Sequence, residues 1–219
     1  MADPLFIERD GHRTWLKWHR GRRKASDPVF TGARIIEAMR LGASVEVDLV
    51  VTGDKGFAVL HDLTLDRETT GSGLAAATGD ATIRRLHLRG NDGAPIPEKV
   101  MLLDDLCTLM AQGQLHADAL LQLDYKEDET VLDARAIDNF ARATAAVAGN
   151  IIVSSGSAAA IGLLAAAVPA MKTGYDASDE QKFRTALANG TLQAFVDDAV
   201  AALPGSHLIY LYWEIVTAA

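Results

Sequence analysis

Ala43-Ser44-Val45-Glu46-Val47-Asp48-Leu49-Val50-Val51 is the stretch that decides the fold, because it places two acids inside an otherwise apolar run. It is rich in β-branched residues and is bounded by Gly42 and Gly53, which predicts a β-strand. Side chains alternate along a strand, so Glu46 and Asp48 share one face. Two like charges side by side in a buried strand are costly unless a cation lies between them. The pattern therefore predicts a bound metal ion.

Histidines flank this strand on both sides in the sequence. His19-Arg20-Gly21 precedes the strand, and His61-Asp62 follows it. Imidazole titrates near neutral pH, so these side chains are suited to proton transfer. Together with the two acids, they indicate a metal-dependent enzyme.

Strand-like and helix-like segments alternate along most of the chain. Strands are expected at 14–18, 43–51, 57–60, 119–125, 151–153, 171–175 and 207–216, and helices at 32–41, 103–112, 130–147, 158–167 and 180–203. Such repeated units imply parallel strands covered by helices. An open sheet and a TIM barrel both fit this order. Functional residues near the ends of several strands, without a Gly-rich phosphate loop after the first strand, favour the α/β TIM (β/α)8 barrel.

The composition bounds the class of protein. The chain has 219 residues, of which 49% are hydrophobic and 23% charged, as in a single soluble globular domain. A net charge of −8 argues against a nucleic-acid partner. Cys107 is the only cysteine, so no intrachain disulfide is possible. The N-terminus lacks the apolar core of a signal peptide, and the low-charge stretch 151–170 is interrupted by Ser, Gly and Pro. A cytoplasmic protein without stable membrane insertion is expected.

Two further charged features have open interpretations. Arg20, Arg22, Arg23 and Lys24 form a basic run after His19, which is either a solvated loop or a means of attracting an anionic substrate. Asp124 and Lys126 share one face at the end of the expected strand 119–125. They either mark a strand that emerges into solvent or add to the charged cluster around Glu46 and Asp48.

These motifs, in this order, resemble the glycerophosphodiester phosphodiesterase family. The segment Leu63-Thr64-Leu65-Asp66-Arg67-Glu68-Thr69-Thr70-Gly71-Ser72-Gly73 follows His61-Asp62 and is close to that family's HD-x-x-L-x-R-T-T-x-G-x-G pattern. The resemblance extends more loosely through the Asp124 strand and residues 151–155. It implies a TIM barrel with a small insertion after the second strand, at about residues 52–100.

The resemblance also implies roles for seven residues. It assigns Glu46, Asp48 and Asp124 to a divalent cation, Mg²⁺ or Ca²⁺, His19 and His61 to general acid–base catalysis, and Arg20 and Lys126 to binding of the substrate phosphate. Hard carboxylate oxygens suit either ion. The implied reaction is hydrolysis of a small-molecule glycerophosphodiester to glycerol 3-phosphate and an alcohol, with a cyclic phosphate as the family's expected intermediate. The oligomeric state does not follow from the sequence.

Three features depart from the family pattern. Ala25-Ser26-Asp27-Pro28-Val29-Phe30 stands where family members usually carry a Pro-Glu-Asn-Thr stretch that contacts substrate. Asp124 is one methylene shorter than the usual glutamate. Only six barrel strands are expected, with Trp213 in the sixth, whereas a TIM barrel has eight. Strands 7 and 8 are thus expected to be absent from the single domain 1–219, because of a missing C-terminal piece rather than an open barrel.

Two alternative functions stay open. A related phospholipase that acts on lysophospholipid or sphingolipid headgroups would use the same residues, although the sequence offers no amphipathic membrane-binding stretch. A non-catalytic binder of phosphate esters would keep the barrel and lose the chemistry. The presence of both histidines and all three acids weighs against that alternative.

Overall fold

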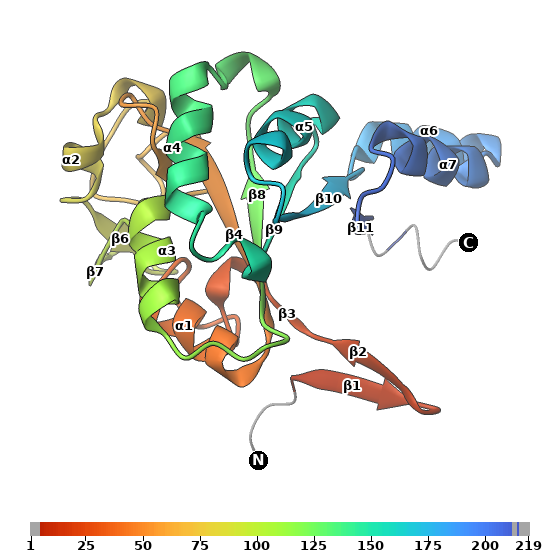
Figure 1. The fold of residues 1–219 in the computed structure, drawn as a ribbon, viewed down its shortest axis with the longest axis horizontal. Coiled ribbons are helices and arrows are strands. Elements are labelled where there is room, and N and C mark those ends of the chain that lie inside the picture. The colour runs from red at the N-terminus through yellow and green to blue at the C-terminus, as the bar shows by residue number, and fades with distance from the viewer. Residues whose placement is uncertain (1–4, 212–213, 215–219) are drawn as a thin grey trace.

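A curled sheet of parallel strands forms the body of the protein in the computed structural model, which describes residues 5–211 and 214 (Figure 1). Its parallel strands are β3 (Lys17–Trp18), β4 (Ser44–Val51), β8 (Leu120–Tyr125), β9 (Ile151–Ser155), β10 (Lys172–Asp176) and β11 (Leu208–Tyr210). They lie side by side in chain order, and every neighbouring pair is parallel. This is the strand order of a TIM barrel, so the expected TIM-barrel-like α/β fold is confirmed.

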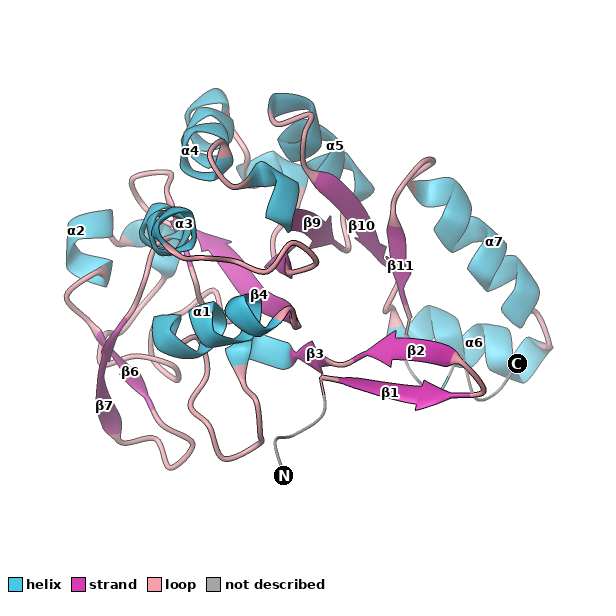
Figure 2. Cartoon of the chain, turned by 60° about the horizontal axis from the view of Figure 1, so that its bottom comes forward, coloured by secondary structure: helices cyan, strands magenta, loops and turns pink. Residues whose placement is uncertain are grey.

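Helices cover the outer face of the sheet (Figures 1 and 2). The main helices are α1 (Gly32–Leu41), α3 (Leu103–Gln112), α4 (Ala134–Thr144), α5 (Ala158–Ala167), α6 (Glu180–Asn189) and α7 (Leu192–Ala202). Helices α1, α3, α4 and α5 pack successively against one another. Among the described residues, no helix is long and apolar enough to cross a membrane.

Residues 52–100 form the insertion after the second barrel strand. This segment holds β5 (Phe57–Ala58), which pairs antiparallel with β4, and the hairpin of β6 (His87–Arg89) and β7 (Pro95–Lys99). Short helical turns, η2 (Ala75–Ala77) and α2 (Asp80–Ile83), complete it. The insertion therefore has regular structure of its own, although it contains no crossover helix of barrel length.

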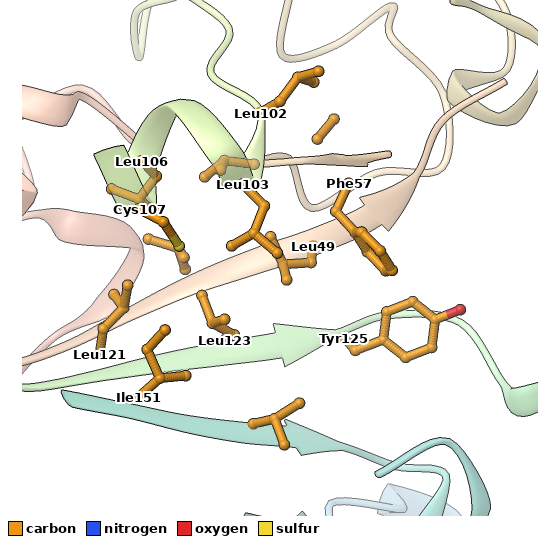
Figure 3. Close-up of a cluster of buried hydrophobic side chains, with 14 of the residues drawn as sticks. Leu49, Phe57, Leu102, Leu103, Leu106, Cys107, Leu121, Leu123, Tyr125 and Ile151 are labelled. Carbon is orange, nitrogen blue, oxygen red and sulfur yellow. The ribbon is translucent and has the colours of Figure 1, made fainter. Parts of the chain in front are cut away.

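The apolar core lies between the sheet and the helices. Leu49, Leu121 and Leu123 point from the strands toward Leu106 and Cys107 of α3 (Figure 3). Strand β4 is buried on both faces, because its other face looks into the curled sheet and carries Glu46 and Asp48. Burial of apolar surface between the helices and the outer face of the sheet stabilises the fold by about 25 cal/mol per Å². The inner face can therefore carry polar groups.

The first expected strand, 14–18, is wrong in detail. Residues 12–15 form β2 (His12–Trp15), which pairs antiparallel with β1 (Phe6–Arg9), and only β3 joins the main sheet. The hairpin turn at Asp10 and Gly11 has positive φ at both residues, 52° and 78°, as in a two-residue hairpin loop of type I′. The hairpin extends away from the body (Figure 1). Trp15 in this hairpin is 42% exposed, whereas Trp18 is buried.

Two expected helices are shorter than predicted. The helix expected over 180–203 is divided, because Gly190 adopts φ 66° and ends α6 before α7 begins. The helix expected over 130–147 gives way to the turn η3 (Glu129–Val131), the helix α4 and the turn η4 (Ala148–Asn150). Of the strand expected over 207–216, β11 covers only the first part, and Trp213 lies outside the described residues.

Candidate active site

Three carboxylates meet on the inner face of the sheet. The register of β4 and β8 places Asp48 directly beside Asp124, and Glu46 lies two residues before Asp48 on the same face. One oxygen from each of the three carboxylates lies within 4.8 Å of the others, and all three residues are buried. The structure thus brings together the three acids that the sequence singled out, in an arrangement that can hold a divalent cation.

Two cations lie against these carboxylates. Lys126 Nζ is 2.7 Å from Asp48 Oδ1 and also donates a hydrogen bond to Asp124 Oδ2. Arg20 Nε is 3.1 Å from Asp48 Oδ2. Both Asp48 oxygens are buried, yet neither accepts a well-formed hydrogen bond. Buried carboxylate oxygens that are compensated by charge alone suit a hard cation such as Mg²⁺ or Ca²⁺.

Crowding of charged groups in this cluster shifts the pKa values of Glu46 and Lys126. Burial, with the neighbouring charge of Asp48, raises the pKa of Glu46 to about 8, although the Arg20 backbone N–H donates to Glu46 Oε2 at 2.8 Å and opposes the shift. Burial alone would lower the pKa of Lys126, but the carboxylates of Asp124 and Asp48 raise it above its usual value. Lys126 is therefore a permanent cation in this cluster.

His19 is positioned by a backbone turn directly after β3. The turn η1 (His19–Gly21) has left-handed backbone at Arg20 (φ 55°) and Gly21 (φ 68°). A Cβ at Gly21 would lie 2.8 Å from Ile35 Cγ1, so the turn requires glycine both for conformation and for space. His19 Nε2 lies 3.7 Å from Glu46 Oε2, and its side chain is 60% exposed. Partial burial and the charge of Arg20 lower the pKa of His19, which favours neutral imidazole.

The rest of the basic run is bound into the loop that follows η1. The backbone N–H groups of Arg23 and Lys24 both donate to Asp27 Oδ2 at 3.2 Å. Arg23 also lies 3.5 Å from Glu37 of α1. Of this run, Arg20 is the residue that contacts the acids.

His61 is positioned by side chains in the loop after β5. Its Nδ1 lies 2.9 Å from Asp62 Oδ1, and Asp62 is bound in turn by two nitrogens of Arg67 at 2.6 Å. The hydrogen bonds from Arg67 lower the pKa of Asp62 to about 2. Because an ionised carboxylate only accepts, Nδ1 of His61 carries the proton and Nε2 is left for other partners. Glu68, which is buried, accepts the backbone N–H groups of His61 and Asp62 at 2.9 and 3.1 Å.

The His61 cluster lies within electrostatic range of the carboxylates. Arg67 interacts electrostatically with Asp48, so the loop after β5 comes near the acids of β4. His61, Asp62 and Glu68 also place ligand atoms within 4.8 Å of one another. Arg67 and backbone N–H groups bind the oxygens of Asp62 and Glu68, so this second group orients His61.

The sequence profile of the glycerophosphoryl diester phosphodiesterase family matches residues 19–201. The chain belongs to this family. The match begins at His19 and contains every residue of the carboxylate and histidine clusters. Among curated proteins, none matches the chain.

Solved structures of similar proteins have the same fold. The glycerophosphoryl diester phosphodiesterase of Parabacteroides distasonis is 17% identical with a TM-score of 0.60, over 94% of this chain and 65% of its own. A putative glycerophosphoryl diester phosphodiesterase of Silicibacter pomeroyi is 21% identical with a TM-score of 0.66, over 89% of this chain and 73% of its own. An Oleispira antarctica phosphodiesterase, solved in complex with the product sn-glycerol-3-phosphate, is 20% identical with a TM-score of 0.60, over 92% of this chain and 95% of its own. The chain thus spans less than two thirds of the length of the Parabacteroides relative.

Three further polar residues, Lys17, Gln122 and Ser154, lie around the acids. Lys17 of β3 donates to Gln122 Oε1, and its Nζ lies 4.2 Å from the centre of the Tyr210 ring. Ser154 lies within β9 and donates to Asp124 Oδ1 at 2.7 Å. Sequence reasoning missed Gln122, although its place two residues before Asp124 put both side chains on one face.

A cavity lies beside the acids of this phosphodiesterase-family chain. It has a volume of about 600 Å³, and Leu63, Asp124, Lys126 and Asp176 are among the residues that line it. Such a volume accommodates a small molecule. Because Lys126 is part of both the cavity wall and the carboxylate cluster, a bound anion there would lie within reach of the cluster's cations.

Proposed function

We propose that this protein is a metal-dependent phosphodiesterase that hydrolyses glycerophosphodiesters to glycerol 3-phosphate and an alcohol. The observation that carries the proposal is the convergence of three buried carboxylates within 4.8 Å of one another, with Arg20 and Lys126 against them. Family membership supports the reaction, as does the product sn-glycerol-3-phosphate in the Oleispira phosphodiesterase of the same fold.

Glu46, Asp48 and Asp124 would hold the divalent cation, Mg²⁺ or Ca²⁺. When bound, the cation neutralises charge on the phosphate and stabilises the charge that develops during attack on phosphorus. Arg20 and Lys126 contribute donors to the non-bridging phosphate oxygens, which are anionic and favour charge-assisted hydrogen bonds. The cationic state of Lys126 follows from its raised pKa.

The two histidines divide the proton transfers. His19, whose pKa is lowered, accepts the proton of the glycerol hydroxyl next to the phosphate. That oxygen attacks phosphorus, the bond from phosphorus to the alcohol oxygen breaks, and His61 in its protonated form donates from Nε2 to the leaving oxygen. Water then opens the cyclic phosphate with the histidine roles reversed. Each positioned transfer contributes roughly 10²–10⁴-fold to the rate.

Release of glycerol 3-phosphate from glycerophosphocholine tests the proposal directly. Turnover should be lost after treatment with EDTA and should return with Mg²⁺ or Ca²⁺. Lysophosphatidylcholine and sphingomyelin serve as parallel substrates, and preferential cleavage of either would replace the proposal with the phospholipase alternative. Binding of phosphate esters without any turnover would replace it with the non-catalytic alternative, and turnover that persists in EDTA would refute the metal dependence.

A further inference from the structure

A chain of hydrogen bonds crosses the inner face of the sheet and ends on Asp124. Lys17 Nζ donates to Gln122 Oε1, Gln122 Nε2 donates to Ser154 Oγ at 2.8 Å, and Ser154 Oγ donates to Asp124 Oδ1 at 2.7 Å. The register of β8 and β9 sets Ser154 directly beside Asp124. The chain therefore joins a cation of β3 to a carboxylate of β8 through two neutral side chains.

The direction of every bond in this chain is fixed by its first donor. An ammonium group can only donate, so the oxygen of Gln122 faces Lys17 and the amide nitrogen faces Ser154. The Ser154 oxygen accepts from that nitrogen, so its own proton is directed to Asp124. An ionised carboxylate only accepts, which completes the chain without a conflict of donors or acceptors.

Burial makes these bonds costly to lose. Ser154 is 0% exposed, and Gln122 and Asp124 are 6% and 7% exposed. A buried polar group that loses its partner carries the full penalty of desolvation. The Asp124 carboxylate has Oδ1 bound to Ser154, while Oδ2 accepts from Lys126, which also contacts Asp48. One oxygen of Asp124 lies within 4.8 Å of an oxygen of Glu46 and an oxygen of Asp48.

We propose that Ser154 is a positioning residue for the metal site. Its hydrogen bond turns the Asp124 carboxylate so that Oδ2 faces the bound metal ion, and Gln122 and Lys17 fix the direction of the Ser154 hydroxyl. This inference rests on the metal site of the proposed function and goes beyond it by assigning residues outside the ligand set. It also accounts for the short side chain of Asp124. A carboxylate with one methylene fewer reaches less far, and a hydrogen bond on its rear oxygen holds it in the one orientation that serves the site.

Calorimetric titration with Ca²⁺ and with Mg²⁺ measures the effect without any substrate. Ser154→Ala should weaken binding of the ion by roughly 10- to 100-fold, as is typical when a residue that orients a metal ligand is removed. Ser154→Thr keeps the hydroxyl and should recover most of the affinity. Ser155→Ala is the matched control, since the neighbouring Ser155 hydroxyl is also buried but accepts the Ser157 backbone N–H at 3.1 Å instead.

A double-mutant cycle separates positioning from general damage. In an Asp124→Asn background, Ser154→Ala should change the ion affinity by less than about 2-fold, because coupled residues are strongly non-additive. Equal ion affinities in Ser154→Ala and Ser155→Ala would overturn the inference. It would also be overturned if Ser154→Ala lowered the ion affinity as much in the Asp124→Asn background as in the wild-type protein. If Ser154→Ala does not fold, Ser154→Cys tests the same bond, since a thiol is a weak donor. Wild-type affinity in Ser154→Cys would then overturn the inference.

The outcomes for Ser154 and for the proposed function are distinguishable. A wild-type protein that binds neither ion would overturn both the Ser154 role and the metal dependence. Binding of the ion with wild-type affinity in Ser154→Ala would overturn the Ser154 role alone. If the wild-type protein binds the ion but shows no phosphodiesterase turnover, the proposed reaction is refuted. A loss of ion affinity in Ser154→Ala would still support the positioning role in that case.

Discussion

The two histidines of the site are held by opposite means. His19 is placed by its backbone, in a turn with left-handed Arg20 and Gly21, and its imidazole makes only a 3.7 Å approach to Glu46. His61 is placed by side chains, through Asp62 and Arg67, with Glu68 beneath its backbone N–H. One side of the site therefore depends on a strained turn, and the other on a network of charges.

This difference matches the two proton transfers that we propose. A base must be neutral before reaction, and partial burial beside Arg20 favours neutral His19. An acid must transfer its proton from a defined ring nitrogen, and the ionised Asp62 retains the proton on Nδ1, so the proton on Nε2 is the one transferred. The network around His61 thus specifies which nitrogen transfers the proton, whereas the turn at His19 specifies where its ring lies.

Removal of either imidazole should have the largest effect. His19→Ala and His61→Ala should each lower kcat for glycerophosphocholine by roughly 10²–10⁴-fold, the usual contribution of a positioned acid or base. Circular dichroism and thermal melting should show an intact fold in both. Near-normal turnover in both variants would refute the assignment, and loss in only one would show that a single histidine serves both transfers.

Asp62→Asn should have the next largest effect, because it tests the network alone. The amide can donate as well as accept, so it no longer requires the proton on Nδ1 of His61. We expect kcat to fall by roughly 10- to 100-fold with little change in KM, which is smaller than the loss of the imidazole itself. Asp66→Asn is the matched control, because Asp66 is exposed and accepts the Gly73 backbone N–H instead. An equal loss of kcat in both variants would mean that the loop, and not the tautomer, matters.

The sequence predicted the parts of this site that depend on strand periodicity. Alternation placed Glu46 with Asp48, and Asp124 with Lys126, on single faces, and the apolar flanks predicted buried strands. The parallel order of six strands followed from repeated βα units. Each of these features follows from residues that are close together in the sequence. None of them depends on which residue of a distant strand lies opposite.

Contacts between distant segments could not be read in this way. The bond from Ser154 to Asp124 depends on the register of β8 and β9, which no local pattern reveals. The hairpin of β1 and β2 is a different case. Its signal was present as Asp10-Gly11, a strong hairpin sequence, but the short exposed strands beside it carry no hydrophobic alternation toward a core.

Gly21→Ala should destabilise the backbone turn that positions His19. Alanine at φ 68° is strained, and its Cβ would lie 2.8 Å from Ile35 Cγ1, so we expect a loss of about 1–2 kcal/mol in the free energy of unfolding. Urea denaturation measures this loss. Gly73→Ala, also at positive φ but with open space around it, is the control for conformational strain alone. If both variants lose the same stability, the contact with Ile35 contributes nothing.

The last expected effect concerns pH, and it separates the two sides of the site by their acids. The pKa of Glu46, beside His19, is raised from 4.5 to about 8. The folded protein therefore binds more protons than the unfolded chain between these values. Without metal, stability should fall as pH rises through this window, by at most about 1.4 kcal/mol per pH unit. Asp62, beside His61, has a pKa of about 2 and stays ionised throughout.

A divalent cation should reverse this trend, because it favours the ionised form of Glu46. Melting temperatures at pH 7, 8 and 9, with and without Ca²⁺, should show stabilisation by the ion that grows with pH until Glu46 is fully ionised. Glu46→Gln carries no titrating proton, so its metal-free melting temperature should change less over the same range. Asp62→Asn should retain the wild-type trend, since Asp62 does not titrate there. A wild-type trend that survives in Glu46→Gln would mean that another group titrates in this window, and that the acid beside His19 is not the pH-sensitive one.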